Sequence, residues 1–430
     1  MVMKSNKNKI KVLVFPAGEV NALELHDALS SCVNVTLYGA SSVDRHGPYI
    51  FKNYISGLPM IYDELFFDRF HEVIDQYGID VVFPTHDTVA QIFAENRDRI
   101  HARVIAADQR TAEICRDKRK TYQLFQGETF CPKTDQNIEE FPMFIKPVDG
   151  QGSVGTKRIE NAQEIPAGLD RERYVLCEYL PGEEYTVDCF TDRHGRLRTV
   201  LPRSRKRTLA GISVSSETVE PADEFLTIAQ TINQKLQFRG LWWFQVKRDR
   251  RGGLKLLEIS TRCAGTMCMA RALGVNLPLL SVYDAMELEI EIWPNLYHAA
   301  VDRTLISRYK LDYEYDTVYF DFDDTLVVDG KVHLPAIRFL YQCRNENKTI
   351  ILLTKHSADI YTDIKKSCIA ETLFDRIIEI NPQESKAAYI NPRRAIFIDN
   401  AYAERKEVRD AHHIPVFDVD AIEFLTDWRR

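Results

Sequence analysis

The chain is 430 residues long, which is more than one hydrophobic core usually holds, so about two to four folded units are expected. Its composition, 45% hydrophobic and 28% charged, is typical of globular proteins, and no apolar stretch is long enough to span a bilayer. The net charge of −7 argues against a general nucleic-acid binder, and nine scattered cysteines without a C-x-x-C pair predict the reduced thiols of a cytoplasmic protein. A homo-oligomer is compatible with this composition.

The first 112 residues alternate between strand-like and helix-like segments. Apolar runs predict strands and amphipathic patterns predict helices at these positions: strands 10–15, 33–38, 79–83 and 103–106, and helices 63–77 and 87–98. Alternation of this kind builds a parallel sheet with helices on both faces. Ala17-Gly18 forms a tight turn after the first strand but lacks the full G-x-G-x-x-G pattern, so dinucleotide binding is only weakly indicated.

His86 and Asp87 follow the strand 79–83 at its carboxyl end, where sheets of this class bind ligands. They are therefore candidates for contact with a small molecule. The simpler interpretation, which we favour, is that Asp87 caps the helix that follows.

A glycine-rich loop follows a strand in the middle third of the chain. The strand is predicted at 144–147, and Gly150, Gly152 and Gly155 come soon after it. Backbone N–H groups of such a loop can close around an anion, and Lys146 can reach the same phosphates. Upstream, Lys118 lies at the start of a helix that continues to about residue 126. Taken alone, the loop could also be a plain hairpin turn.

Two pairs of strands are predicted downstream of this loop. Residues 175–188 are expected to form two strands paired around a turn, where a strand end can read an adenine edge and an acid can bind ribose hydroxyls. Gln245 and Glu258 lie on adjacent strands, 241–248 and 254–260, and can bind Mg²⁺ through oxygen. The pair Trp242-Trp243 is expected in the core, because adjacent strand residues face opposite sides.

These features in this order resemble the ATP-grasp superfamily, most closely its carbamoyl-phosphate-synthase-like branch, over residues 1–305. The resemblance implies an α/β multidomain protein with a Rossmann-like pre-ATP-grasp domain at 1–112 and an α+β ATP-grasp domain at 113–305. It also implies the ligands: ATP contacts from Lys118, Lys146, Gly152, Ser153, Glu178, Leu180 and Glu184, and Mg²⁺ (or Mn²⁺) ligands Gln245, Glu258 and Ser260. Ser260 stands where the family usually has Asn, so we expect a weaker second Mg²⁺ site.

The chemistry of that family would make this region a ligase. ATP activates a carboxylate as an acyl phosphate, which an amine or similar nucleophile attacks, giving ADP and phosphate. Arg262, which the family pattern retains, is expected to contact the γ-phosphate or the acyl phosphate. Two alternatives remain open: a non-catalytic ATP-sensing module that regulates the rest of the chain, and a phosphotransferase that releases a stable phosphorylated product.

The basic run 203–207 allows two interpretations with equal support. One is a contact with phosphate or substrate, and the other is a solvated basic face. If the strand 196–201 continues, Arg203 and Arg205 project to one side and Lys206 to the other.

Acidic and polar residues end three apolar runs near the end of the chain. Asp321 and Asp323 follow the run 318–320, Thr354 closes 350–353, and Asp399 closes 395–398. Lys386 lies in the polar segment between the last two runs. A turn with solvated acids would explain the first pair alone, but not the ordered set.

This order of Asp, Thr, Lys and Asp resembles the haloacid dehalogenase (HAD) superfamily of phosphatases over about residues 316–430. The resemblance implies that Asp321 attacks phosphorus to form an aspartyl phosphate and that Asp323 protonates the leaving oxygen. Thr354 and Lys386 would contact the phosphate, and Asp321, Asp399 and the backbone carbonyl of Asp323 would bind Mg²⁺. Asn400 stands where the family often has a second Asp, so a tail that binds phosphate without cleaving it is a further alternative.

Spacing predicts that this HAD-like Rossmannoid domain lacks a large cap. Asp321 and Thr354 are 33 positions apart and Thr354 and Lys386 are 32 apart, which leaves no room for a cap once a helix is placed. The site should therefore be open to a bulky phosphate ester. Residues 306–315, which are polar, are the predicted linker. The chain is thus expected to be a bifunctional cytoplasmic enzyme.

Overall fold

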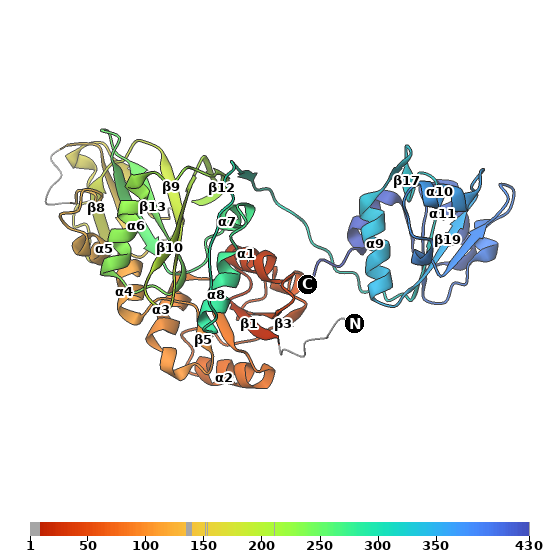
Figure 1. The fold of residues 1–430 in the computed structure, drawn as a ribbon, viewed down its shortest axis with the longest axis horizontal. Coiled ribbons are helices and arrows are strands. Elements are labelled where there is room, and N and C mark those ends of the chain that lie inside the picture. The colour runs from red at the N-terminus through yellow and green to blue at the C-terminus, as the bar shows by residue number, and fades with distance from the viewer. Residues whose placement is uncertain (1–8, 135–139, 151, 153, 210, 430) are drawn as a thin grey trace. The chain divides into compact units, whose positions relative to one another are not determined.

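The computed structural model describes residues 9–134, 140–150, 152, 154–209 and 211–429 (Figure 1). The chain folds into two compact units, one ending at Leu305 and the other running from Ile306 to Arg429. The predicted boundary at 112 falls inside the first unit, and residues 306–315 form neither helix nor strand. None of the described helices is long and apolar enough to cross a membrane.

The first unit begins with a five-stranded parallel sheet of order β3-β2-β1-β4-β5. Its strands are β1 (Ile10–Phe15), β2 (Val35–Ala40), β3 (Asn53–Ile55), β4 (Val81–Pro84) and β5 (Arg103–Val104). Alternate residues of β1 enter different cores, Val12 and Val14 on one face and Leu13 and Phe15 on the other. The parallel sheet predicted from the alternating pattern is confirmed, whereas β3, which is short and half polar, was not predicted.

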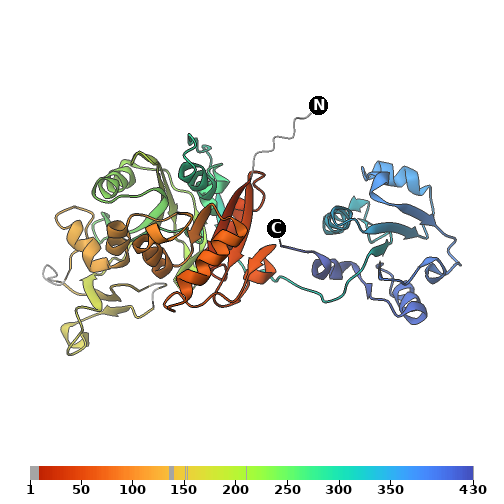
Figure 2. The ribbon, with the colours of Figure 1, turned by 90° about the horizontal axis from the view of Figure 1, so that it is seen from below.

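Helices cover both faces of this sheet (Figures 1 and 2). On the Leu13 face lie α2 (Phe66–Tyr77) and α3 (Asp87–Glu95), which contribute a cluster of phenylalanines. On the Val12 face lie α1 (Val20–Leu29), α7 (Cys268–Ala272) and α8 (Leu277–Ala285). The core on that second face also contains Phe190, Leu241 and Trp243 from the next sheet, so the first 112 residues share a core with the rest of the unit.

The middle of the unit is an antiparallel sheet of order β10-β9-β13-β14. Its strands are β9 (Glu184–Thr191), β10 (Leu197–Ser204), β13 (Gly240–Arg248) and β14 (Leu254–Ser260), and α6 (Asp223–Lys235) packs against it. Gln245 and Glu258 are directly opposite each other on β13 and β14, as expected. Trp242 and Trp243 are both buried, which confirms that this pair belongs to the core.

The strands predicted to pair within 175–188 belong to different sheets. A three-stranded sheet of order β7-β6-β8 contains β6 (Met143–Pro147), β7 (Lys157–Ile159) and β8 (Tyr174–Glu178), whereas β9 pairs with β10 and β13. The reason lies in the turn after β8, where Gly182 N–H donates to the Arg248 carbonyl (3.0 Å). A Cβ at Gly182 would lie 2.7 Å from Arg248 Cβ, so only glycine allows this close passage to β13. The prediction of a local hairpin was therefore wrong.

Aspartates begin the two helices that precede the glycine-rich loop. Asp108 accepts from Thr111 N at the start of α4 (Gln109–Arg116), and Asp117 accepts from Arg119 N and Lys120 N at the start of α5 (Lys118–Leu124). The second cap fixes Lys118 in the first turn of its helix. The remaining strands of the unit form a small sheet made of β11 (Arg207–Leu209), β12 (Ile212–Glu217) and β15 (Ala300–Asp302).

The second unit is built on a parallel sheet of order β20-β19-β16-β21-β22. Its strands are β16 (Thr317–Phe320), β19 (Thr349–Thr354), β20 (Arg376–Glu379), β21 (Ala395–Ile398) and β22 (Val416–Phe417). Because β16 lies between β19 and β21, the carboxyl ends of these three strands meet at one edge. Asp321, Thr354 and Asp399 are all at that edge.

Helices flank this sheet on two sides. The core on one face includes residues of α9 (Leu334–Asn345), α10 (Ile360–Lys366) and α12 (Ile422–Leu425), and the core on the other face includes α11 (Tyr402–His412). Between Asp321 and Thr354 the chain forms a short hairpin, β17 (Val327–Val328) and β18 (Lys331–Val332), followed by α9. These elements fill the spacing that the sequence indicated was too short for a cap.

Candidate active sites

The first unit contains a cavity of about 230 Å³ beside the glycine-rich loop. Its walls include most of the side chains predicted to bind ATP or Mg²⁺: Lys118, Lys146, Gly152, Glu178, Leu180, Glu184, Gln245 and Glu258. The predicted Ser153 lies outside the described residues. Segments far apart in sequence thus line one space.

Two buried lysines line this cavity. Lys118 Nζ donates to the Gly150 carbonyl (2.9 Å) and lies 3.7 Å from Glu258 Oε2. Burial lowers the pKa of Lys118, and the Glu258 charge opposes that shift. Lys146 Nζ lies 2.6 Å from the Tyr122 hydroxyl and 3.5 Å from the Leu257 carbonyl. Because the hydrogen-bond partners of Lys146 in the described part of the chain are neutral oxygens, its charge is available to an anion.

Arg205 connects the acidic and amide groups of the cavity. Its Nε lies 2.7 Å from Glu184 Oε1, and Nη2 donates to the Gly211 carbonyl (2.9 Å). One orientation of the Gln245 side-chain amide satisfies both of its polar atoms. In that orientation the amide oxygen of Gln245 accepts from Arg205 Nη1 (2.8 Å) and the amide nitrogen donates to Glu258 Oε1 (3.1 Å). A metal ion shared by Gln245 and Glu258 would require this amide to turn over.

The predicted neighbours of adenine lie at the end of β8. Glu178 Oε1 accepts from the backbone N–H of Lys133 (2.8 Å), and Leu180 is buried. The Glu178 carboxylate therefore fixes the strand end. The other carboxylate oxygen and the backbone groups at the strand end line the cavity.

A second cavity, of about 270 Å³, shares part of its wall with the first. The common lining residues are Lys118, Gly150, Gly152, Arg205, Gly211, Gln245 and Glu258. The rest of the wall adds the cations Arg116, Arg203 and Arg262 and the acids Glu19 and Asp87. Because cationic side chains outnumber acidic ones around this space, it suits an anionic substrate.

Asp87 holds two predicted site residues in the second cavity. Its carboxylate accepts from Arg262 Nη2 (2.8 Å) and from Ser260 Oγ (2.8 Å). Burial raises the pKa of Asp87, but Arg262 and the Ser260 hydroxyl outweigh burial and bring it below its usual range. The cap of α3 is His86, whose Nδ1 accepts from Thr88 N (3.2 Å), so the prediction that Asp87 caps the helix was wrong. Ser260, which was predicted to bind Mg²⁺, donates its hydroxyl hydrogen to Asp87.

The basic run divides between the cavity and the solvent. Arg203 is 2% exposed and pairs with Asp188 through Nε (2.7 Å) and Nη2 (3.2 Å). Lys206, which is exposed, pairs with Glu217. The interpretation of this run as a solvated face is therefore wrong for Arg203 and Arg205 and correct for Lys206.

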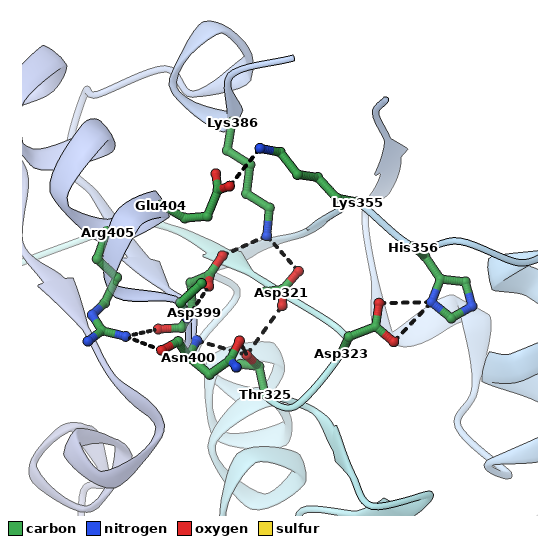
Figure 3. A network of polar contacts seen from close by, with 11 residues as sticks. Asp321, Asp323, Thr325, Lys355, His356, Lys386, Asp399, Asn400, Glu404 and Arg405 are labelled. Atoms are coloured by element: carbon green, nitrogen blue, oxygen red, sulfur yellow. Dashed lines mark hydrogen bonds and ion pairs between the residues drawn. The ribbon is translucent and has the colours of Figure 1, made fainter. Parts of the chain in front are cut away.

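In the second unit, Lys386 bridges two carboxylates at the carboxyl edge of the sheet (Figure 3). Its Nζ lies 2.6 Å from Asp321 Oδ1 and 2.6 Å from Asp399 Oδ2, and the three side chains are at most 7% exposed. Burial raises the pKa of Asp321 to about 6; Lys386 opposes this rise and Asp399 adds to it. For Lys386 the two carboxylates outweigh burial and raise the pKa.

The loop after β21 is tied to the nucleophile candidate through Thr325. Thr325 Oγ1 lies 3.3 Å from Asp321 Oδ2 and 3.3 Å from Asn400 Oδ1, and it accepts from Asn400 N–H (3.0 Å). Arg405 Nη1 donates to the carbonyls of Asp399 (2.6 Å) and Asn400 (2.7 Å). Asn400 thus serves as a neutral link where a second Asp would add a negative charge.

Thr354 and Asp323 differ in exposure. Thr354 is fully buried, and its hydroxyl has no hydrogen-bond partner in the described part of the chain. An orphaned hydroxyl of this kind costs free energy that a phosphate oxygen would recover. The Asp323 side chain is 53% exposed and faces His356, with Nδ1 at 2.9 Å and 3.0 Å from its two oxygens.

The two units offer different sets of oxygen donors to Mg²⁺. Within the described ranges, no three His, Cys, Asp or Glu side chains converge as a metal cluster. Mg²⁺, however, commonly takes one or two carboxylates and completes its shell with water and substrate phosphate. Asp321 and Asp399 in the second unit, and Glu258 in the first, fit that pattern. Ser260 donates its hydroxyl hydrogen to Asp87 and keeps its oxygen lone pairs, so its place as a ligand stays a prediction.

Part of the first unit matches a known protein family. Residues 170–303 match the family model described as ATP-grasp in the biosynthetic pathway with Ter operon. A comparison with curated proteins finds no match. Together with the fold, the family match shows that the chain contains an ATP-grasp domain.

Solved structures with a similar fold include three enzymes. Biotin carboxylase from Campylobacter jejuni has a TM-score of 0.55 and 13% identity, over 66% of this chain and 72% of that chain. L-amino acid ligase from Bacillus licheniformis has a TM-score of 0.53 and 14% identity, over 66% and 75%. N5-carboxyaminoimidazole synthetase from Staphylococcus aureus has a TM-score of 0.52 and 13% identity, over 66% and 79%.

Sequence reasoning did not single out the roles of Asp87 and His356. Asp87, at the start of α3, is 173 positions from Ser260, at the end of β14, and only the folded chain brings them together. His356 offered a usable indication, because it follows the predicted Thr354 by two positions at the end of β19.

Proposed function

We propose that the first unit is an ATP-dependent ligase that joins a carboxylate to an amine, or to a similar nucleophile, through an acyl phosphate. The observation that carries this proposal is the wall common to the two cavities, which contains Lys118, Arg205 and Glu258. A nucleotide in the first cavity would present its terminal phosphate at this wall, and an acceptor in the second would meet it from the other side.

In this reaction a carboxylate oxygen attacks the γ-phosphorus and the bond to the ADP oxygen breaks. The amine nitrogen then attacks the acyl carbon, phosphate leaves, and the amine proton passes to solvent. Lys118 and Lys146 would hold the phosphates, and Arg262, fixed by Asp87, would orient the acceptor. Mg²⁺, when bound at Glu258, would supply further neutralisation of phosphate charge.

The test is a screen of amino acids, sugar acids and amines for ADP release, with mass spectrometry of the products. A new mass equal to carboxylate plus amine minus water supports the ligase. A phosphorylated acceptor without a new amide supports the phosphotransferase alternative. ATP binding without acceptor-dependent ADP release supports a sensing module, the second candidate, which is favoured by Ser260 standing where the family usually has Asn.

We also propose that the second unit is a Mg²⁺-dependent phosphatase of the HAD type. The triad of Asp321, Lys386 and Asp399 carries this proposal. Asp321 would attack phosphorus while Asp323 gives its proton to the leaving oxygen. Water would then attack the aspartyl phosphate and return a proton to Asp323, releasing phosphate and restoring Asp321. The ester hydrolysed could be a substrate or product of the ligase.

Hydrolysis of an aryl phosphate with Mg²⁺, abolished by Asp321→Asn, is the measurement that tests this role. If the wild type binds phosphate but hydrolyses no ester, the non-cleaving alternative suggested by Asn400 is correct. Separately expressed units that act on unrelated compounds would disprove the coupling of the two reactions.

A further inference from the structure

We propose that His356 is a positioning residue that holds Asp323 for proton transfer; this inference rests on the phosphatase function proposed above. Asp323 lies in the loop after β16, and its side chain is 53% exposed. A carboxylate this exposed rotates freely among its rotamers unless a neighbour fixes it. His356 is that neighbour (Figure 3).

The imidazole contacts Asp323 on one side and a second carboxylate on the other. Nδ1 lies 2.9 Å and 3.0 Å from the two oxygens of Asp323, and Nε2 lies 3.0 Å from Asp363 Oδ2. Between two ionised carboxylates the ring donates from both nitrogens as an imidazolium, and when Asp323 carries a proton on one oxygen its other oxygen can still accept from Nδ1. The partner at Nε2 therefore fixes the orientation of the Nδ1 bond.

The ring itself has little freedom to move. Its side chain is only 7% exposed, and it packs edge-on against Phe322, with ring centroids 5.3 Å apart and planes at 78°. Asp363 lies in the first turn of α10, whose N-cap is Asp359. One buried imidazole thus connects an exposed catalytic carboxylate to a capped helix.

A contact to so exposed a carboxylate contributes little to stability, so a purely structural role explains the arrangement poorly. Restricting an acid to few orientations has a larger effect on catalysis, because proton transfer requires the donor within hydrogen-bond reach of the leaving oxygen. His356 therefore affects the step in which Asp323 protonates the leaving group, and has less effect on the attack by Asp321.

The test compares kcat/KM for phenyl phosphates that differ only in their ring substituents. This constant reports the steps up to and including phosphorylation of Asp321, and so includes departure of the leaving group. Substitution His356→Leu should lower kcat/KM about 100-fold for phenyl phosphate, whose leaving group needs a proton. For 4-nitrophenyl phosphate, whose leaving group needs little help, the loss should be less than about 5-fold. The plot of log kcat/KM against leaving-group pKa therefore becomes steeper in the variant.

Two further variants separate positioning from folding. His356→Asn keeps a donor near the Nδ1 position and should recover most of the activity on phenyl phosphate. In an Asp323→Asn background, His356→Leu should cause no additional loss, because the two residues act as one unit. Thermal unfolding of each variant checks that it is folded.

An equal loss on every ester, no loss on any, or a loss that persists without the Asp323 carboxylate would overturn the positioning role. If the wild type hydrolyses none of these esters faster than Asp321→Asn does, the phosphatase function itself is wrong. The two failures therefore give different patterns.

Discussion

The two candidate sites are built in different ways from the same kinds of side chain. In the second unit, Lys386 and two carboxylates form a buried triad at the edge of one parallel sheet. In the first unit, the cavities draw their residues from helices and strands of several sheets, and cations outnumber acids there. The triad is compact because neighbouring parallel strands end together, whereas the cavity site exists only once separate layers have packed.

The two candidate sites also differ in net charge. Two carboxylates and one lysine leave the triad with a net negative charge, which suits a divalent cation beside a phosphate. In the first cavity, Lys146 has neutral hydrogen-bond partners and offers its positive charge directly to an anion. If the proposed functions are correct, we expect the second unit to depend more strongly on Mg²⁺ than the first, which has cations of its own.

The strongest test of this comparison is Asp321→Asn. Removing the nucleophile should reduce ester hydrolysis at least about 1000-fold, because no aspartyl phosphate can form. Release of ADP by the first unit should be unaffected. Parallel assays of both activities on one preparation check this, and a matched loss of both would mean that the units are not independent catalysts.

The converse variant is Lys146→Met, which keeps the length of the side chain but removes its charge. Release of ADP should fall about 100-fold, because a cation that contacts phosphate is lost in a buried site. The phosphatase serves as the internal control. An unchanged rate of ADP release would show that Lys146 is structural, through its contact with Tyr122.

The pH dependence of the phosphatase gives a third test. Because the pKa of Asp321 is raised to about 6, its attacking anion is lost as pH falls through that value, and kcat/KM should drop about tenfold per pH unit below it. The folded unit also binds this proton more tightly than the unfolded chain does. The contribution of Asp321 to the free energy of unfolding therefore decreases as pH rises from its ordinary pKa of 3.8 to about 6.

Rate profiles between pH 4.5 and 8, with Mg²⁺ held constant, provide the first measurement, and urea unfolding over the same range provides the second. An activity that stays level to pH 4.5 would mean that bound Mg²⁺ keeps Asp321 ionised.

The smallest expected effect concerns the buried pair of Asp87 and Arg262. Asp87→Asn leaves the guanidinium without its charged partner and should lower the free energy of unfolding by about 2 kcal/mol. Lys206→Ala, which breaks an exposed ion pair in the same unit, is the matched control and should cost less than about 1 kcal/mol. Equal losses in urea unfolding would contradict the buried role of Asp87.

The same contrast explains what the sequence could predict. Both parallel sheets could be predicted from their apolar runs, and Asp321, Thr354 and Asp399 could be placed at one edge because each closes such a run. The placement of β8 and β9 in different sheets could not be predicted, because it depends on the contact between Gly182 and the backbone of Arg248. The hydrogen bond of Ser260 to Asp87 could not either, because propensity carries no information about a contact between distant segments.

One apolar cluster contains Val12 and Val14 together with Phe190, Leu241 and Trp243. This shared cluster limits where the chain can be divided into fragments that fold. A fragment ending near residue 112 would expose one side of its sheet to water and would be prone to aggregate. A fragment that is meant to fold as this unit should therefore include all residues up to Leu305. The first five strands are an integral part of the first unit and not a separate domain.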